Sequence, residues 1–154
     1  MKILHVETGR HLYGGPQQVM YLIGALDARG HESVLVCPPG SGIDAAARKA
    51  GIRVQNLFCA GDVDLPFAYR LTQYLKELRP DLVHCQSRRG ADMLGGMAAN
   101  FADIPAVVSR RVDNAEMRLL AALRYRPFSK IIAISETIAR VLREHGVDDD
   151  RIEV

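Results

Sequence analysis

The sequence contains no tryptophan, only three cysteines and no long apolar run. A membrane-spanning helix needs about 20 consecutive apolar residues, so we expect no such helix. The opening MKILHVETGR has too short an apolar stretch for a secretory signal. Cys37, Cys59 and Cys85 are odd in number and show no metal-ligand spacing. We therefore predict free thiols in a cytoplasmic protein.

Signatures of several enzyme classes are also missing. The glycine-containing segment GRHLYGG has neither the Lys-Ser/Thr pair of a Walker loop nor the GxGxxG pattern of dinucleotide-binding proteins. No Ser-His-Asp arrangement, pair of catalytic carboxylates or zinc-ligand pattern is evident. The acidic run 148–150 lacks the glycine-punctuated spacing of a calcium loop. We therefore predict neither a metal nor any other cofactor.

The charge is modest but uneven. The net charge is +2, yet residues 82–130 carry eight Lys/Arg against four Asp/Glu, whereas residues 131–154 carry three against six. This basic middle segment favours an anion-facing patch, for phosphates or an acidic membrane surface. Nucleic acid is disfavoured as a partner because the total charge is small and no aromatic residues interleave the arginines.

Strand-like and helix-like patterns alternate along the chain. Strands are predicted over 2–7, 33–38, 52–58, 81–86, 105–109 and 130–134. Helices are predicted over 16–29, 43–50, 67–79, 89–102, 114–126 and 136–145, with Phe101 on a buried stripe. Residues 151–154 begin a further strand-like segment. This alternation predicts an α/β fold with a doubly wound, Rossmann-like parallel sheet in the strand order 3-2-1-4-5-6.

In that strand order, ligands bind where the order reverses, between the first and fourth strands. The loop after the first strand contains Gly14 and Gly15, which leave backbone N–H groups open to an anion at a helix start. The loop after the fourth strand contains Arg88 and Arg89, whose guanidinium groups favour phosphate oxygens. A tight strand-to-helix turn without any ligand is the alternative explanation of the two glycines.

Three segments resemble the N-terminal half of GT-B glycosyltransferases, and in particular the retaining glycosyltransferases of family four, also called group 1. They are KILHVETGRHLYGGPQQVMYLIGALDARGHESVLVCPPG, LRPDLVHCQSRRGADMLGG and AISETIARVLREHGV. The resemblance implies two Rossmann-like domains, the first for the acceptor and the second for the nucleotide of the sugar donor. Residues 1–154 then form the acceptor-side domain, without the donor-binding domain, and are expected to be inactive by themselves.

The resemblance also implies site residues. Gln86 stands where the family often has a histidine that contacts the transferred sugar; Gln can hydrogen-bond a hydroxyl but cannot titrate. Retention in the family is ascribed to a front-face mechanism without a protein base. The loop that approaches the donor diphosphate and the acceptor contains His11, Tyr13, Gly14 and Gly15. Acceptor-binding candidates are His84, Ser87, Arg88, Arg89, Arg110 and Arg111, with Ser135 and Glu136 in a secondary role.

The expected activity is transfer of a hexose from a nucleotide sugar to a cell-surface polysaccharide, a lipopolysaccharide or a lipid-linked acceptor. We expect a cytoplasmic location, with peripheral contact to anionic lipids at the inner face of the membrane. Two alternatives stay open: a non-catalytic phosphosugar-binding module, and part of a GT-B sugar-nucleotide epimerase. His84, at the end of an apolar strand, also fits a buried structural histidine.

Overall fold

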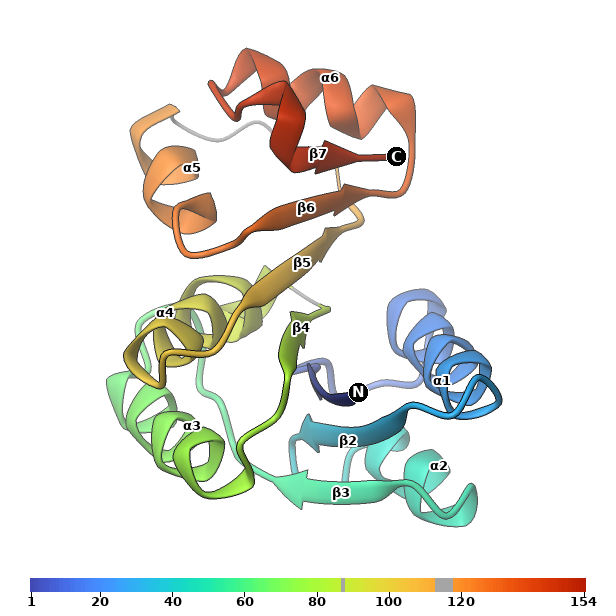
Figure 1. Cartoon of the computed structure of the whole chain (residues 1–154). Helices are drawn as coiled ribbons and strands as arrows, with labels where there is room; N and C mark the ends of the chain where they lie inside the picture. Colours follow the sequence, from blue (N-terminus) through green and yellow to red (C-terminus); the bar gives the residue numbers. More distant parts are fainter. Residues whose placement is uncertain (87, 113–117) are drawn as a thin grey trace.

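Seven parallel strands form one sheet in the order β3-β2-β1-β4-β5-β6-β7 (Figure 1). The computed structural model describes residues 1–86, 88–112 and 118–154. The predicted order of the first six strands is confirmed, and β7 adds one strand at the edge beside β6. The strands are β1 Lys2–Val6, β2 Glu32–Cys37, β3 Arg53–Asn56, β4 Leu82–Cys85, β5 Ala106–Arg110, β6 Lys130–Ala133 and β7 Ile152–Glu153.

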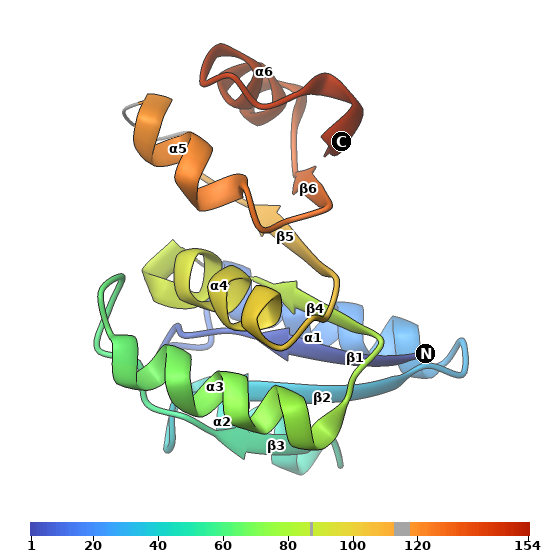
Figure 2. The ribbon, with the colours of Figure 1, turned by 60° about the vertical axis from the view of Figure 1, so that its left-hand side comes forward.

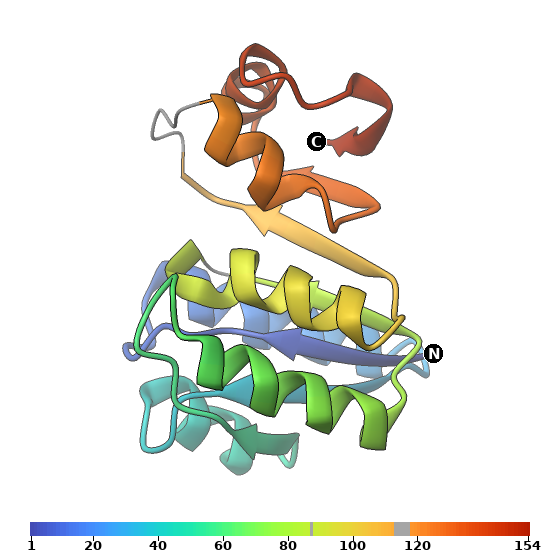
Figure 3. The ribbon, with the colours of Figure 1, turned by 90° about the vertical axis from the view of Figure 1, so that its left-hand side faces the viewer.

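Helices cover both faces of this sheet. They are α1 Gly14–Asp27, α2 Gly42–Lys49, α3 Leu65–Leu78, α4 Met93–Phe101, α5 Arg118–Tyr125 and α6 Glu136–Glu144, with single turns at Arg88–Asp92 and Asp149–Arg151. Helices α1 and α2 lie on one face, and α3, α4 and α5 follow one another along the other (Figures 2 and 3). This division follows from right-handed crossovers, because the chain winds first one way and then the other from β1.

Alternate residues of the strands supply two apolar cores. In β2, Val34 and Val36 join the larger core, which includes residues of α3, α4, α5 and α6. Leu35 and Cys37 point to the opposite face and pack with residues of α1 and α2. Both sets are fully or almost fully buried, which explains why β2 reads as a continuous apolar run.

The helix ends follow local chemistry. The Asp64 carboxylate accepts a hydrogen bond from the Phe67 N–H at 2.9 Å and so caps α3. At its other end Arg79 adopts a left-handed conformation, with φ of 51°, directly before Pro80. A buried ion pair, 2.8 Å between Arg124 Nη1 and Asp92 Oδ1, joins α5 to the start of α4.

Three details differ from the sequence prediction. Helix α1 begins at Gly14, two residues before the predicted Pro16. The predicted helix 89–102 is divided into a π-helical turn, Arg88–Asp92, and α4. Phe101 was expected on a buried stripe, but 64% of it is exposed because Leu94, Gly95, Ala98 and Ala99 form the buried face of α4 and Phe101 lies outside it. The first residues of the predicted helix 114–126 lie outside the described residues.

Candidate functional site

The carboxyl ends of β1, β4 and β5 enclose a cleft of about 450 Å³. We call it the polar cleft; its lining residues are Glu7, Gly9, Arg10, His11, Gly15, Pro16, Gln86, Ser109, Arg111 and Val112. The loop after β1 and the residue that follows β4 therefore meet at one site, although they are some seventy residues apart in the sequence. The site lies where the strand order reverses, as expected for a doubly wound sheet.

Arg111 connects the three segments that line the polar cleft. Its Nη1 donates to the Gly15 carbonyl at 2.6 Å, and its Nη2 donates to Gln86 Oε1 at 2.9 Å. A Cβ at Gly15 would lie 3.1 Å from Arg111 Nη1, so glycine allows this close approach. The guanidinium is thereby fixed beside the start of α1.

Gln86 is almost completely buried and is held from two sides. Because arginine only donates, the amide oxygen of Gln86 must face Arg111 and its NH₂ group must face His5. The distance from Gln86 Nε2 to His5 Nδ1 is 3.3 Å. His5 Nδ1 is then the acceptor, which assigns the proton of the neutral ring to Nε2.

Two buried histidines lie beneath the cleft. Burial lowers the pKa of His5 to about 4, against a smaller opposing effect of Asp27. Burial, together with smaller effects of the nearby His5 and Arg111, lowers the pKa of His84 to about 3. His84 Nε2 lies 2.8 Å from the Ser109 hydroxyl. Both imidazoles are therefore neutral at pH 7 and act as hydrogen-bonding groups rather than charges.

The start of α1 brings the Gly15 N–H to the cleft. Pro16 has no N–H, and the Gln17 N–H donates to the Tyr13 carbonyl at 3.3 Å. The first N–H groups of a helix have no partner within that helix. Tyr13 precedes α1 and makes no side-chain cap, and the first turn contains no acidic residue. Together with Arg111, this helix end offers an anion both peptide dipoles and a fixed positive charge.

The other predicted site residues lie in different surroundings. Tyr13 lines a neighbouring hollow, and Gly14 has open space around its Cβ position. Arg110 is 2% exposed, and its guanidinium donates to the Tyr125 hydroxyl and the Val112 carbonyl, so it does not line the polar cleft. Ser135 caps α6 through the Ile138 N–H, at 3.3 Å.

Four further predicted site residues belong to the loop after β4 and to α6. Ser87 lies outside the described residues. The backbone of Arg88 and Arg89 forms the π-helical turn, and their side chains also lie outside the described part of the chain. The Gly90 N–H in that turn donates to Asp62 Oδ1 at 2.7 Å, which ties the turn to the loop before α3. Glu136 makes an exposed ion pair with Arg143 at 2.6 Å.

The sequence analysis assigned no role in the site to Arg10 or Ser109. Val107 of β5 lies opposite His84 on the neighbouring strand, and Ser109 is two residues further along β5. Because side chains alternate between the faces of a strand, this spacing predicts that Ser109 lies on the same face as His84, where the two side chains meet. Arg10 lies in an irregular loop, for which no periodic signal exists.

The described residues, 1–86, 88–112 and 118–154, lack two further kinds of feature. None of the helices within them combines the length and the apolar surface that crossing a membrane requires. In the same part of the chain, no three His, Cys, Asp or Glu side chains are grouped so that they could hold a metal ion.

The sequence model of glycosyltransferase family 4 matches residues 13–154. Comparison with curated protein sequences gave no match. Among solved structures, Anabaena HepE in complex with UDP and glucose has a TM-score of 0.80 at 17% identity, over 99% of this chain and 43% of HepE. The lipopolysaccharide outer core galactosyltransferase WaaB has a TM-score of 0.72 at 17% identity, over 100% of this chain and 45% of WaaB.

A Listeria monocytogenes protein assigned as a UDP-N-acetylglucosamine 2-epimerase is also similar, with a TM-score of 0.69 at 15% identity. The match covers 98% of this chain and 43% of that protein. At these identities the likeness shows the fold, which is that of the N-terminal half of GT-B proteins. The chain thus spans less than half the length of the structures that it matches.

Proposed function

This chain belongs to glycosyltransferase family 4, and from that premise we propose that it is the acceptor-side domain of a sugar-transferring enzyme. Residues 1–154 bind the acceptor and contact the donor diphosphate, while a second domain, outside this chain, binds the donor nucleotide. The donor is a nucleotide sugar, as in HepE with UDP-glucose. The transferred unit is a hexose, and the acceptor is a glycan or a lipid-linked saccharide of the kind that WaaB modifies in lipopolysaccharide.

The observation that carries this proposal is the meeting of Arg111, Gln86 and the start of α1 in one cleft. Sugar transfer breaks the bond between the anomeric carbon and a diphosphate oxygen, which leaves negative charge on the departing diphosphate. The Gly15 N–H at the start of α1 and the Arg111 guanidinium stabilise that charge. Gln86 orients the sugar through its amide, and it has no titrating proton to exchange.

Release of nucleoside diphosphate tests the proposal. The natural protein that contains this chain should release it from at least one of UDP-, GDP-, ADP- or dTDP-hexoses when a membrane extract supplies acceptors. Arg111→Ala should lower kcat by about 100-fold, because it removes charge stabilisation from the leaving group. Arg53→Ala is the control, since Arg53 is exposed at the start of the edge strand β3 and does not line the polar cleft. No release with any donor, or an unchanged rate in Arg111→Ala, would contradict the proposal.

The 154-residue chain alone provides a second measurement. It should bind inorganic pyrophosphate, with amide shifts at Gly14 and Gly15, yet bind UMP weakly and release no nucleoside diphosphate. A non-catalytic phosphosugar-binding module predicts the same binding but no turnover by the natural protein. An epimerase, which the Listeria relative keeps as a candidate, predicts conversion of the sugar nucleotide without acceptor and without nucleoside diphosphate release.

The proposed location is the cytoplasmic face of a membrane. Leu119, Leu120 and Leu123 of α5 are exposed, and the exposed Arg126 follows three residues after Leu123. Exposed leucines beside a basic residue suit a surface of anionic lipid. Co-sedimentation should show stronger binding to vesicles with anionic phosphatidylglycerol than to phosphatidylcholine vesicles, and Leu119→Ser with Leu123→Ser should weaken it. Equal binding to both vesicle types would remove this support.

A further inference from the structure

A second hollow of about 500 Å³ lies beside the polar cleft. It is formed by the loop before α1, the loop between β2 and α2, and Phe58 after β3. We call it the aromatic pocket. Arg10 and His11 line both hollows, so a ligand of two linked units can extend from one into the other.

Three ring systems line the aromatic pocket and remain in contact with solvent. Tyr13 is 75% exposed and Phe58 is 45% exposed. The rings of His11 and Tyr13 stack with centroids 5.5 Å apart and an interplanar angle of 22°. The Arg10 guanidinium lies 5.4 Å from the centre of the Phe58 ring. Exposed rings gathered in a hollow add little to the core, and they provide flat apolar faces for a ligand.

The floor of the pocket is rigid because two loops are joined through their backbones. The Gly42 N–H donates to the Arg10 carbonyl at 2.9 Å. A Cβ at Gly42 would lie 2.9 Å from the Leu12 backbone nitrogen, so only glycine permits this approach. The pocket is therefore formed before any ligand arrives, which reduces the entropic cost of binding.

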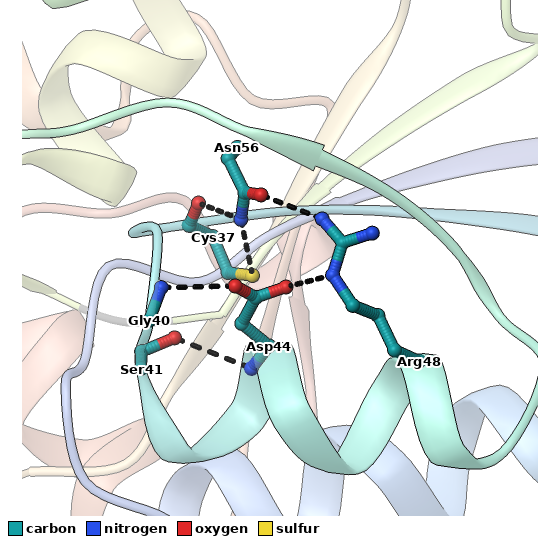
Figure 4. Close-up of polar contacts among 6 residues, drawn as sticks. All are labelled: Cys37, Gly40, Ser41, Asp44, Arg48 and Asn56. Atoms are coloured by element: carbon teal, nitrogen blue, oxygen red, sulfur yellow. Dashed lines mark hydrogen bonds and ion pairs between the residues drawn. The ribbon is translucent and has the colours of Figure 1, made fainter.

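Figure 4 shows the side chains that hold the loop between β2 and α2. Asp44 accepts hydrogen bonds from the Gly40 N–H at 2.9 Å and from Arg48 Nε at 2.7 Å. Burial opposes ionisation of Asp44, but these bonds outweigh it and hold the pKa of Asp44 below its ordinary value. Arg48 also donates to Asn56 Oδ1 at 2.6 Å, which connects the loop to the end of β3.

Building on the proposed function, we propose that the aromatic pocket binds a second sugar ring of the acceptor. A pyranose ring has an apolar C–H face, which packs on the negative face of an aromatic ring, and a rim of hydroxyls, which suits Arg10 and the backbone of the proline-containing loop. The reacting sugar occupies the polar cleft and the preceding sugar lies on Tyr13 and Phe58. The enzyme then selects acceptors at least two sugars long.

The test uses the ¹⁵N-labelled 154-residue chain and NMR titration. Probes are glucose, galactose and mannose; their disaccharides maltose, cellobiose, lactose and α-1,2-mannobiose; UMP; and inorganic pyrophosphate. At least one disaccharide should bind about tenfold more tightly than its monosaccharides and shift the amides of Tyr13, Gly40 and Phe58. Tyr13→Ala and Phe58→Ala should each weaken that binding about tenfold.

Tyr21→Ala is the matched control, because Tyr21 is 68% exposed on α1 and lines neither hollow. Binding of no disaccharide, equal binding of disaccharide and monosaccharides, or equal effects of Tyr13→Ala and Tyr21→Ala would overturn the inference. Tighter binding of UMP at Phe58 would also overturn it. Pyrophosphate reports separately on the polar cleft: if it binds while disaccharides do not, the inference fails and the proposed function stands.

Discussion

The polar cleft and the aromatic pocket lie side by side, but they are built in opposite ways. In the polar cleft, Gln86 is buried and hydrogen-bonded to His5 in the floor beneath it, and Arg111 connects Gln86 to α1. In the aromatic pocket, Tyr13 and Phe58 are largely open to solvent and the rigidity comes from the loop backbones. Substitutions in the polar cleft should therefore cost folding free energy, whereas ring substitutions in the aromatic pocket should cost binding alone.

The largest predicted effect is a loss of folding stability at acidic pH, which depends on the two histidines beneath the polar cleft. Below pH 6.5 the unfolded chain binds protons at His5 and His84, while the folded chain does so only near pH 4 and 3, so stability falls as the pH falls. Asp92 acts in the opposite direction, because burial raises its pKa to about 6 despite Arg124. From pH 7 to 5 we expect a net loss of about 2.5 kcal/mol in the free energy of unfolding, measured by urea denaturation.

The matched variant for this pH dependence is His84→Gln, which keeps a hydrogen-bonding group but cannot take up the proton. It should lose about 2 kcal/mol less than the parent chain over the same interval. Stability that is unchanged or greater at pH 5 than at pH 7 would show that the two histidines are not buried as neutral groups.

Gln86→Leu tests the hydrogen-bonded floor directly. The substitution leaves Arg111 and His5 without their partner in a buried setting, and we expect a loss of about 2 kcal/mol in unfolding free energy. Gln55→Leu is the control, because Gln55 is half-buried on β3 and donates only a weak bond of 3.5 Å. Similar urea midpoints for the two variants would mean that the floor contributes little to stability.

Gly42→Ala tests whether the close contact between the two loops of the aromatic pocket contributes to folding stability. The added Cβ would meet Leu12 and push the two loops apart, with an expected cost of about 1 kcal/mol and loss of disaccharide shifts. Gly24→Ala is the comparison, because no atom lies within 4 Å of its Cβ position inside α1 and alanine favours helices. It should raise the thermal midpoint, whereas Gly42→Ala should lower it; equal midpoints would contradict the close approach.

The smallest effect is expected for Tyr13→Ala and Phe58→Ala. Each should change the free energy of unfolding by less than about 0.5 kcal/mol, because the rings are exposed. Chemical denaturation of both variants beside the parent chain measures this. A loss above about 2 kcal/mol in either variant would assign the ring to the core and remove the contrast between the two hollows.

The convergence of Gly15 and Gln86 was predictable, because alternating strands and helices leave few allowed crossovers and the strand order then defines where the loops meet. The roles of Arg110 and Arg111 were not. Since Val107 and Val108 are both apolar, the sequence does not reveal which face each β5 residue occupies. Phe58 was missed for another reason. The aromatic pocket is lined by loops, and loop residues show no periodic pattern of apolar side chains from which their position could be predicted.

Arg110 and Arg111 are neighbours in sequence, yet one guanidinium is enclosed with Tyr125 and the other reaches Gly15. A one-residue deletion late in β5 would bring Arg111 to the enclosed place of Arg110, and a one-residue insertion would bring Arg110 to the place of Arg111 at the cleft. Changes in the length of β5 are therefore tolerable only in steps of two residues. Related chains that retain both arginines should differ from this one in the length of β5 by an even number of residues.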